Sequence, residues 1–370
     1  MRALVTGGAG FIGSHISDRL LAEGYAVRVL DNLQPRVHPL GKPRHVSREV
    51  EFVEGDVRDK PTLRAALRGV DVVFHEAAYQ DYMPDFSTFF STNAVSTALI
   101  LEILVEERWP LRKLIVASSQ AVYGEGQYRC ARHGDFQPLG REAERLAAGQ
   151  WDVVCAQCGL PAEALWLDER DHNPCNAYAV SKLAEELTAL RLGQLHDIPA
   201  VALRYSITQG PRQSLFNGYS GICRIFSARA FNGQPPVIFE DGAQRRDYVH
   251  IADVVDANWL VLNDARADYQ AFNVGSGRAT TVREYAAALL RAIGADIEPV
   301  LPGEYRLGDN RHSVSSITRL EALGWRPRCT LDDIFRDFLG WIREHGEVGA
   351  YFAEADRQMR AQGVVRRVAS

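Results

Sequence analysis

The sequence contains no apolar run close to the roughly 18 residues that a membrane-spanning helix requires. Its N-terminus leads from Met1-Arg2 straight into a glycine-rich turn, unlike a signal peptide. Basic residues are not in excess either, since 42 Lys and Arg stand against 47 Asp and Glu, and the net charge of −5 argues against nucleic-acid binding. Six cysteines in 370 residues are too few for a disulfide scaffold. These absences predict a soluble, cytoplasmic protein that binds neither membranes nor nucleic acids.

A glycine-rich turn opens the chain. Residues 2–6 are typical of a short buried strand, and residues 11–23 are typical of a helix with apolar positions at helical spacing. Gly7, Gly10 and Gly13 lie between them. Glycines there let the backbone bend sharply and approach a pyrophosphate, whose charge then lies at the helix N-terminus. This pattern predicts a dinucleotide site.

An acidic residue supports that prediction. The next strand, residues 26–30, ends in Asp31, which follows Gly13 by 18 positions. A carboxylate there accepts hydrogen bonds from an adenosine ribose and repels a 2′-phosphate, so NAD is favoured. Arg28 and Arg36 lie close enough in sequence to leave NADP open.

Four more apolar runs end in small or polar residues, and amphipathic helical stretches separate them. Strands that alternate with helices predict an α/β fold with a doubly wound, parallel Rossmann sheet and ligands at the carboxyl ends of its strands. His75 ends one of these strands beside two alanines, and we expect it to be a structural histidine. The runs are residues 50–53, 71–75, 113–117 and 200–203.

Tyr178 and Lys182 form a Y-x-x-x-K pair, and at positions i and i+4 of a helix both side chains lie on one face. A free phenol has a pKa of about 10, and a neighbouring ammonium favours the phenolate, which makes tyrosine usable as a base near neutrality. Ser119 ends the strand beside the expected cofactor site, where its hydroxyl can share a proton with the tyrosine and a substrate hydroxyl. The three residues suit hydride transfer from a secondary alcohol.

Five segments carry a more specific signal: 6–13 (TGGAGFIG), 118–124 (SSQAVYG), 178–182 (YAVSK), 241–248 (DGAQRRDY) and 272–277 (FNVGSG). With them the chain resembles the NAD-dependent nucleotide-sugar epimerase/dehydratase family of the extended short-chain dehydrogenase/reductase superfamily. The resemblance extends over most of residues 1–345. It implies bound NAD, a nucleotide-diphosphate sugar as substrate, and a homodimer in which helices around 95–106 and 178–195 pair across the interface.

The resemblance also implies roles for individual residues. Ser119, Tyr178 and Lys182 correspond to the catalytic trio. The implied NAD contacts are Gly7, Gly10, Phe11, Ile12, Gly13, Asp31, Asn32, Asp56, Val57, Ala77, Ala78, Tyr178 and Lys182. The implied contacts to the sugar nucleotide are Gln80, Ser119, Gln120, Ser206, Thr208, Asn217, Arg246 and Arg306, of which the two arginines would bind the diphosphate through guanidinium forks.

The residues after the catalytic hydroxyl separate the chemistries of this family. Its 4,6-dehydratases have an Asp-Glu pair there, whereas this chain has Gln120 and Ala121, which cannot shuttle protons. The chain resembles most the 4-epimerase branch, in particular dTDP-L-rhamnose 4-epimerases. This predicts inversion at C4 of a nucleotide-diphosphate sugar through a transient 4-keto intermediate. A reductase or dehydrogenase, a decarboxylase, and a non-catalytic NAD-binding regulatory protein remain as alternatives.

Two departures from the family pattern stand out. Ile207 replaces an asparagine that contacts the sugar nucleotide, so Ser206, Thr208 or Asn217 would substitute for it, or the substrate differs. An insertion of about residues 126–170 separates Ser119 from Tyr178. It contains Cys130-x-x-His133 and Cys155-x-x-Cys158. Two such turns supply a closed, tetrahedral Cys₃His set, which predicts a structural zinc ion; the alternative is a flexible lid with reduced thiols.

The domain organisation follows from these assignments. We expect an NAD-binding Rossmann domain over residues 1–205, which the chain re-enters at about 248–264. A smaller, mixed α/β substrate-binding lobe would span residues 206–346. Residues 347–370 would form a C-terminal helical extension.

Overall fold

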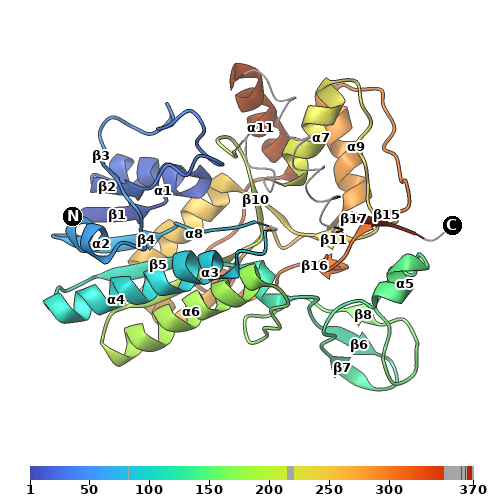
Figure 1. Cartoon of the computed structure of the whole chain (residues 1–370), viewed down its shortest axis with the longest axis horizontal. Coiled ribbons are helices and arrows are strands. Elements are labelled where there is room, and N and C mark those ends of the chain that lie inside the picture. The colour runs from blue at the N-terminus through green and yellow to red at the C-terminus, as the bar shows by residue number, and fades with distance from the viewer. Residues whose placement is uncertain (82, 215–220, 346–359, 361–362, 364, 369–370) are drawn as a thin grey trace.

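The computed structural model describes residues 1–370 except 82, 215–220, 346–359, 361–362, 364 and 369–370 (Figure 1). Seven parallel strands form its main sheet, in the order β13-β9-β5-β4-β1-β2-β3. This order confirms the predicted doubly wound α/β fold. The strands are β1 (Arg2–Thr6), β2 (Ala26–Asp31), β3 (Glu51–Glu54), β4 (Val72–His75), β5 (Lys113–Ser119), β9 (Ala200–Tyr205) and β13 (Gln270–Val274).

Helices cover both faces of the sheet, so its central strands are continuous apolar runs rather than alternating ones. Helices α1 and α8 pack with Val5, Val29 and Phe74 on one face. Helices α2, α4 and α6 pack with Leu4 and Val73 on the other. The helices and helical turns of this domain are α1 (Phe11–Ala22), α2 (Lys60–Leu67), α3 (Phe86–Phe89), η1 (Phe90–Val95), α4 (Ser96–Glu107), η2 (Gln120–Tyr123), α6 (Ala177–Leu195), α8 (Ile251–Asn263) and η3 (Ala265–Ala267).

The continuous helical stretch Phe86–Glu107, made of α3, η1 and α4, corrects one expectation from the sequence. It is long and apolar enough to span a bilayer by length and composition, because Thr, Ser and Asn side chains interrupt its apolar run without adding charge. Ile100, Ile103 and Leu104 of this stretch are buried against the sheet, as in the core helix of a folded domain.

The smaller lobe is built around α7, α9 and α11, whose apolar faces pack together with Tyr248 (Figure 1). The chain re-enters the Rossmann domain through α8 and β13, and it stays there ten residues beyond the expected end at 264, because β13 adds a seventh strand beside β9. The remaining elements after residue 205 are β10 (Ile207–Gln209), α7 (Ile222–Phe231), β11 (Arg245–Arg246), β12 (Tyr248–His250), β14 (Thr280–Thr281), α9 (Val282–Ile293), β15 (Glu304–Arg306), β16 (His312–Ser313), α10 (Thr318–Ala322), α11 (Leu331–His345) and β17 (Val365–Arg367).

The insertion folds into a small unit of its own beneath the second lobe in the view of Figure 1. It consists of a three-stranded antiparallel sheet and one short helix: β6 (Tyr128–Cys130), β7 (Gly134–Phe136), α5 (Ala143–Ala147) and β8 (Glu163–Ala164). Most of the expected C-terminal helical extension lies outside the described residues. Its described part includes a strand, because β17 pairs antiparallel with the free edge of β15.

Candidate functional site

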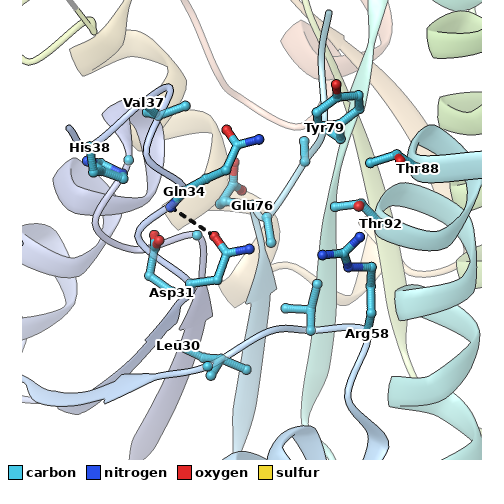
Figure 2. Close-up of a pocket in the computed structure, with 17 residues that line it drawn as sticks. Leu30, Asp31, Gln34, Val37, His38, Arg58, Glu76, Tyr79, Thr88 and Thr92 are labelled. Carbon is cyan, nitrogen blue, oxygen red and sulfur yellow. Dashed lines mark hydrogen bonds between the residues drawn. The ribbon is translucent and has the colours of Figure 1, made fainter. Parts of the chain in front are cut away.

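A cavity opens at the carboxyl ends of β1, β2, β3 and β4, where a doubly wound sheet binds its ligands (Figure 2). Of the thirteen residues expected to contact NAD, seven line it: Gly7, Gly10, Asp31, Asn32, Val57, Ala77 and Ala78. The cavity is also lined by Leu30, Gln34, Val37, His38, Gly55, Arg58, Glu76, Tyr79, Thr88 and Thr92, which the sequence analysis did not single out.

The glycine-rich turn leaves no room for side chains. Gly7 has a φ of +66°, and a Cβ there would lie 2.7 Å from the backbone nitrogen of Ala77. A Cβ on Gly13 would lie 2.5 Å from the carbonyl oxygen of Gly7. Phe11, Ile12 and Gly13 do not line the cavity but form the first turn of α1, whose N-cap, Gly10, makes no side-chain capping bond. The first backbone N–H groups of α1 therefore suit a pyrophosphate.

Asp31 ends β2 at the cavity, and its carboxylate accepts hydrogen bonds from the backbone nitrogens of Ala9 (3.0 Å) and Leu33 (2.9 Å). Each carboxylate oxygen can accept a second bond, so a ribose hydroxyl remains compatible. Arg28 is buried, bonds the carbonyl oxygen of Ala66 and pairs with Glu51 at 2.9 Å. Because Arg36 pairs with Asp81, both arginines that left NADP open are held by other partners.

Asp56 lies beside the cavity rather than on its wall. Its carboxylate forms two bonds with the Arg58 guanidinium (2.9 and 2.6 Å) and one with the Asn32 amide (3.1 Å). These bonds, first among them those from Arg58, lower the pKa of Asp56 to about 2. Arg58, Asn32 and Val57 are the wall residues of this segment, so Asp56 would act on a ligand through them.

Glu76 is a cavity residue that the sequence analysis missed. It directly follows β4, and the rule that ligands lie at the carboxyl ends of strands could have identified it. Its carboxyl group accepts a hydrogen bond from the Tyr205 hydroxyl at 3.0 Å, and burial raises the pKa of Glu76 to about 7. His75, just before it, is fully buried between the hydroxyls of Thr6 (2.7 Å) and Ser96 (2.8 Å), which confirms its structural role.

The predicted reacting groups come together where β5 ends and α6 begins. Ser119 is the last residue of β5, and its side chain lies close enough to the Tyr178 phenol to lower the pKa of that phenol. Helix α6 starts just before Tyr178 because the Asn176 side chain caps it, accepting a bond from the backbone nitrogen of Ala179 at 2.9 Å. Lys182 lies one turn further along, completely buried.

The charges around Tyr178 act in opposite directions. Lys182 lowers the pKa of the phenol, as expected from the sequence, but burial outweighs it and the net pKa of Tyr178 is above its usual 10. The Lys182 ammonium donates to the carbonyl oxygen of Ala117 (2.8 Å) and to Glu185 (2.7 Å). Burial alone would lower the pKa of Lys182, but Glu185 and Tyr178 more than compensate, so it rises.

Most of the residues expected to contact the sugar nucleotide bond other groups of the protein. Gln120 follows Ser119 and accepts a bond from the Ser313 hydroxyl at 3.1 Å. Ser206 is buried and bonds Asp247, while the Thr208 hydroxyl donates to the carbonyl oxygen of Ser206. Asn217 lies outside the described residues. Gln80 is exposed near the cavity; Arg246 donates to the carbonyl oxygens of Asn310 and Arg311, and Arg306 stacks on Phe239.

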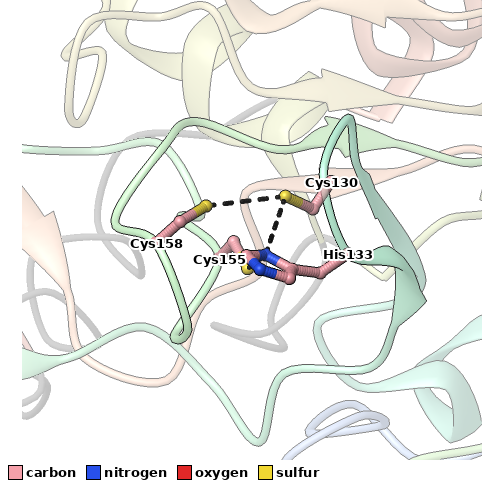
Figure 3. A group of neighbouring side chains, drawn as sticks. All are labelled: Cys130, His133, Cys155 and Cys158. Carbon is pink, nitrogen blue, oxygen red and sulfur yellow. Dashed lines mark hydrogen bonds between the residues drawn. The ribbon is translucent and has the colours of Figure 1, made fainter.

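The four expected metal ligands meet in the insertion, although 28 residues separate the first from the last (Figure 3). Their ligand atoms all lie within 4.8 Å of one another. The Sγ atoms of Cys130 and Cys158 are 3.7 Å apart, and the His133 Nδ1 lies 3.6 Å from Cys130 Sγ and 3.3 Å from Cys155 Sγ. Metal–ligand bonds of ~2.3 Å to sulfur and ~2.1 Å to nitrogen in a tetrahedron give edges of about 3.8 and 3.6 Å.

The local backbone of this Cys/His cluster suits a metal as well. Each two-residue turn is followed by a glycine in the left-handed region, Gly134 (φ +76°) and Gly159 (φ +69°). The backbone nitrogen of Arg132 donates to Cys130 Sγ at 3.4 Å. This bond is the largest of several that lower the pKa of Cys130 to about 6 and favour its thiolate, the form that binds metals.

A buried ion network joins the insertion to the second lobe. Arg141, from the insertion, forks onto Glu240 at 2.8 and 2.9 Å. Arg311 reaches the same carboxylate at 3.0 Å and also pairs with Asp152 and Asp241. The guanidinium groups of Arg141 and Arg311 are almost fully buried, and their pairing with carboxylates offsets the free-energy cost of removing these charges from water. The insertion is thus docked on the loop that contains Asn310 and Arg311, whose carbonyl oxygens accept the hydrogen bonds of Arg246.

Comparison with known proteins gives consistent matches over nearly the whole chain. A dTDP-L-rhamnose 4-epimerase of Burkholderia thailandensis is 33% identical over 350 residues, which cover 93% of this chain and 95% of that protein. The UDP-glucose 4-epimerase of Thermotoga maritima, solved with UDP-glucose, has 29% identity and a TM-score of 0.75, covering 94% of this chain and 100% of that one. The Thermus thermophilus UDP-glucose 4-epimerase, solved with NAD, has 32% identity and a TM-score of 0.73, covering 93% and 99%.

The model of the NAD dependent epimerase/dehydratase family matches residues 3–141 and 156–275 and leaves part of the insertion, residues 142–155, unmatched. This gap agrees with the insertion's folding as a separate unit. Because the family model spans most of the sequence, and one relative is 33% identical over nearly its whole length, the chain belongs to the NAD dependent epimerase/dehydratase family.

Proposed function

We propose that this protein is an NAD-dependent epimerase that inverts C4 of a nucleotide-diphosphate sugar through a transient 4-keto intermediate. The observation that carries the proposal is the grouping of Ser119, Tyr178 and Lys182: Ser119 and Lys182 both lower the pKa of the Tyr178 phenol, and Lys182 also acts on Glu76 in the wall of the cavity. The proteins similar to this chain include several 4-epimerases. Gln120 and Ala121 disfavour dehydration, because neither can act as the acid or base that removal of water requires.

NAD is the proposed cofactor. The residues fit it: Gly7 and Gly10 let the backbone approach a pyrophosphate, Asp31 is placed for a ribose hydroxyl, and Arg28 and Arg36 are already paired with Glu51 and Asp81. When bound, the nicotinamide accepts the C4 hydride and gives it back. We also propose that residues 1–205, with the returning α8 and β13, form the cofactor domain and the rest of residues 206–346 the substrate lobe.

Three side chains of the protein handle the proton of the C4 hydroxyl. Tyr178 takes the proton of the C4 hydroxyl, Ser119 holds that hydroxyl in line with the phenol, and Lys182 stabilises the phenolate. Arg246 and Arg306 are the proposed diphosphate ligands, because each carries a guanidinium group in the second lobe. With the diphosphate held by these two arginines, the sugar would be free to turn, and Tyr178 would return its proton to the C4 oxygen.

A panel of sugar nucleotides tests this function. The purified enzyme is incubated with UDP-, dTDP-, GDP- and ADP-linked sugars, including deoxy- and heptose forms, and inversion at C4 is read by NMR. We expect one nucleotide series to equilibrate between its C4 epimers without added NAD. Net accumulation of NADH, release of CO₂ or loss of water would instead identify a dehydrogenase, a decarboxylase or a dehydratase.

We propose that Cys130, His133, Cys155 and Cys158 bind one zinc ion. All four positions of the tetrahedron are filled by protein, so the ion would order the insertion rather than activate water. Reduced thiols are needed for this, which is consistent with the cytoplasmic location that we also propose.

Metal analysis of protein purified without a His tag tests the zinc proposal. We expect about one zinc per chain, loss of the ion in Cys155→Ser/Cys158→Ser, and faster proteolysis between residues 125 and 170 in that variant. Cys175→Ser is the matched control, because Cys175 is an exposed thiol of the same region outside the Cys/His cluster. Less than about 0.2 zinc per chain after metal-replete expression would refute the proposal.

We propose a homodimer formed through α4 and α6. Apolar side chains are exposed along both helices, among them Val105 on α4 and Leu187 and Leu195 on α6. Sedimentation analysis should give twice the chain mass, and Leu187→Glu should shift it toward monomer. Leu301→Glu is the matched control, since Leu301 is equally exposed (40%) but belongs to the second lobe. A monomeric parent protein at micromolar concentration would contradict the proposal.

A further inference from the structure

A buried carboxyl group next to Lys182 is not explained by the reaction as proposed. Glu185 lies on α6 and is completely buried, and its Oε2 accepts the Lys182 Nζ–H at 2.7 Å. Its Oε1 has no hydrogen-bond partner among the described residues. A carboxyl group held away from water with half of its acceptor capacity unused has a high desolvation cost. Such a feature is often connected with function.

Other titratable groups face this pair from the neighbouring elements. Glu76 approaches from the end of β4 and Tyr205 from β9, and the two bond each other at 3.0 Å. From β4, His75 also faces Lys182 but stays neutral, because burial lowers the pKa of His75 to about 3. On α6 itself Glu186 is occupied: it pairs with Arg204 of β9 at 2.7 Å and accepts the Ser118 hydroxyl of β5. Lys182 is thus the ammonium group shared by Tyr178 and two carboxyl groups.

This arrangement decides whether Glu185 favours or opposes the ionisation of the Tyr178 phenol. Lys182 stabilises the Tyr178 phenolate, whereas a negative charge on Glu185 opposes the phenolate and holds the ammonium toward itself. Burial raises the pKa of Glu185 to about 8, so the carboxyl group is ionised at the more alkaline pH at which the phenol itself titrates. Tyr178 and Glu185 are seven residues apart on one helix, about 10 Å along the axis. At an effective dielectric constant near 20, that separation corresponds to about one pKa unit on the phenol.

We propose that Glu185 is a positioning residue, which holds the Lys182 ammonium and opposes ionisation of Tyr178. The consequence is a catalytic base that keeps its proton in the free enzyme and loses it to solvent as substrate and cofactor bind. The phenolate then takes the C4 hydroxyl proton and returns it to the same sugar. This inference rests on the proposed function for its purpose, though the effect on Tyr178 can be measured without any substrate.

Ultraviolet titration of the enzyme as purified tests the proposal. Phenolate absorbance near 295 nm is measured from pH 6 to 11, and the titration of the Tyr178→Phe variant is subtracted, which isolates Tyr178 from the other twelve tyrosines. Glu185→Gln keeps the shape and the acceptor for Lys182 but removes the charge. We expect the pKa of Tyr178 to be about one unit lower in Glu185→Gln than in the parent enzyme, which is a tenfold change in the proton concentration at the midpoint.

The matched control is Glu186→Gln, which makes the same chemical change at the adjacent buried position but affects Arg204 instead of Lys182. Its Tyr178 titration should stay within about 0.3 unit of the parent, whatever happens to stability. If Glu185→Gln does not fold, the double variant Lys182→Met/Glu185→Gln replaces it, because it removes both buried charges of the pair. The double variant is compared with Lys182→Met alone, and the pKa of Tyr178 should be lower in the double variant. An unmoved or raised Tyr178 pKa in the variant that carries Glu185→Gln would overturn the proposal. A shift without any epimerised sugar would instead leave the proposal standing and count against the proposed function.

Discussion

Gly13→Ala tests how closely α1 must approach the glycine-rich turn. The new Cβ would lie 2.5 Å from the Gly7 carbonyl oxygen and 2.9 Å from Gly8 Cα, where ordinary contacts begin at 3.4 Å. Both neighbours are backbone atoms, so the start of α1 must move by about 0.9 Å (3.4 − 2.5). Overpacking of this kind costs about 1–3 kcal/mol. A displacement near 1 Å of the N–H groups that face the pyrophosphate should weaken NAD binding by about 10- to 100-fold.

The assay combines thermal unfolding with the NAD content of the purified protein. We expect Gly13→Ala to melt a few degrees lower and to lose most of its NAD. Gly340→Ala is the matched control, because Gly340 lies inside α11 and a Cβ there meets nothing within 4 Å. That variant should gain about 0.5–1 kcal/mol from helix propensity and keep its NAD. Parent-like melting and NAD content in Gly13→Ala would refute this account of the turn.

Three further outcomes are expected. Tyr178→Phe should keep its fold and NAD but lose nearly all turnover, since it removes only the hydroxyl that accepts the proton; near-parent kcat would rule out this base. With substrate deuterated at C4, NMR should find the label at C4 of the epimer, and deuterium in water would indicate a different mechanism. The pKa of His75 is lowered to about 3, below about 6.5 in the unfolded chain, so its contribution to stability is complete above pH 6.5 and decreases as pH falls. Urea unfolding at pH 5 should show a loss of about 2 kcal/mol from this group, which His75→Gln removes.

Sequence patterns were sufficient for the sheet and the reacting groups because both depend on local spacing. Buried parallel strands are short apolar runs, and the runs at 113–117 and 200–203 became β5 and β9 with ends shifted by two residues. Tyr178 and Lys182 share a helix face by their i and i+4 spacing alone. The two metal turns were also visible as local patterns, but their meeting in space was a hypothesis until the fold brought 130 and 155 together.

Contacts between distant segments were decided by the tertiary structure. No local pattern links Arg141 to Glu240, which are 99 residues apart, or shows that Arg28 bonds the backbone near α2 instead of facing a phosphate. Likewise β17 is a strand only because β15 offers a free edge. The fold, the cofactor turn and the reacting trio could all be predicted from the sequence, since short-range periodicity and spacing encode them. Burial, which shifts the pKa values of Glu76 and Glu185 and sets the balance of charge around Lys182, depends on every segment that packs there and was decided by the tertiary structure alone.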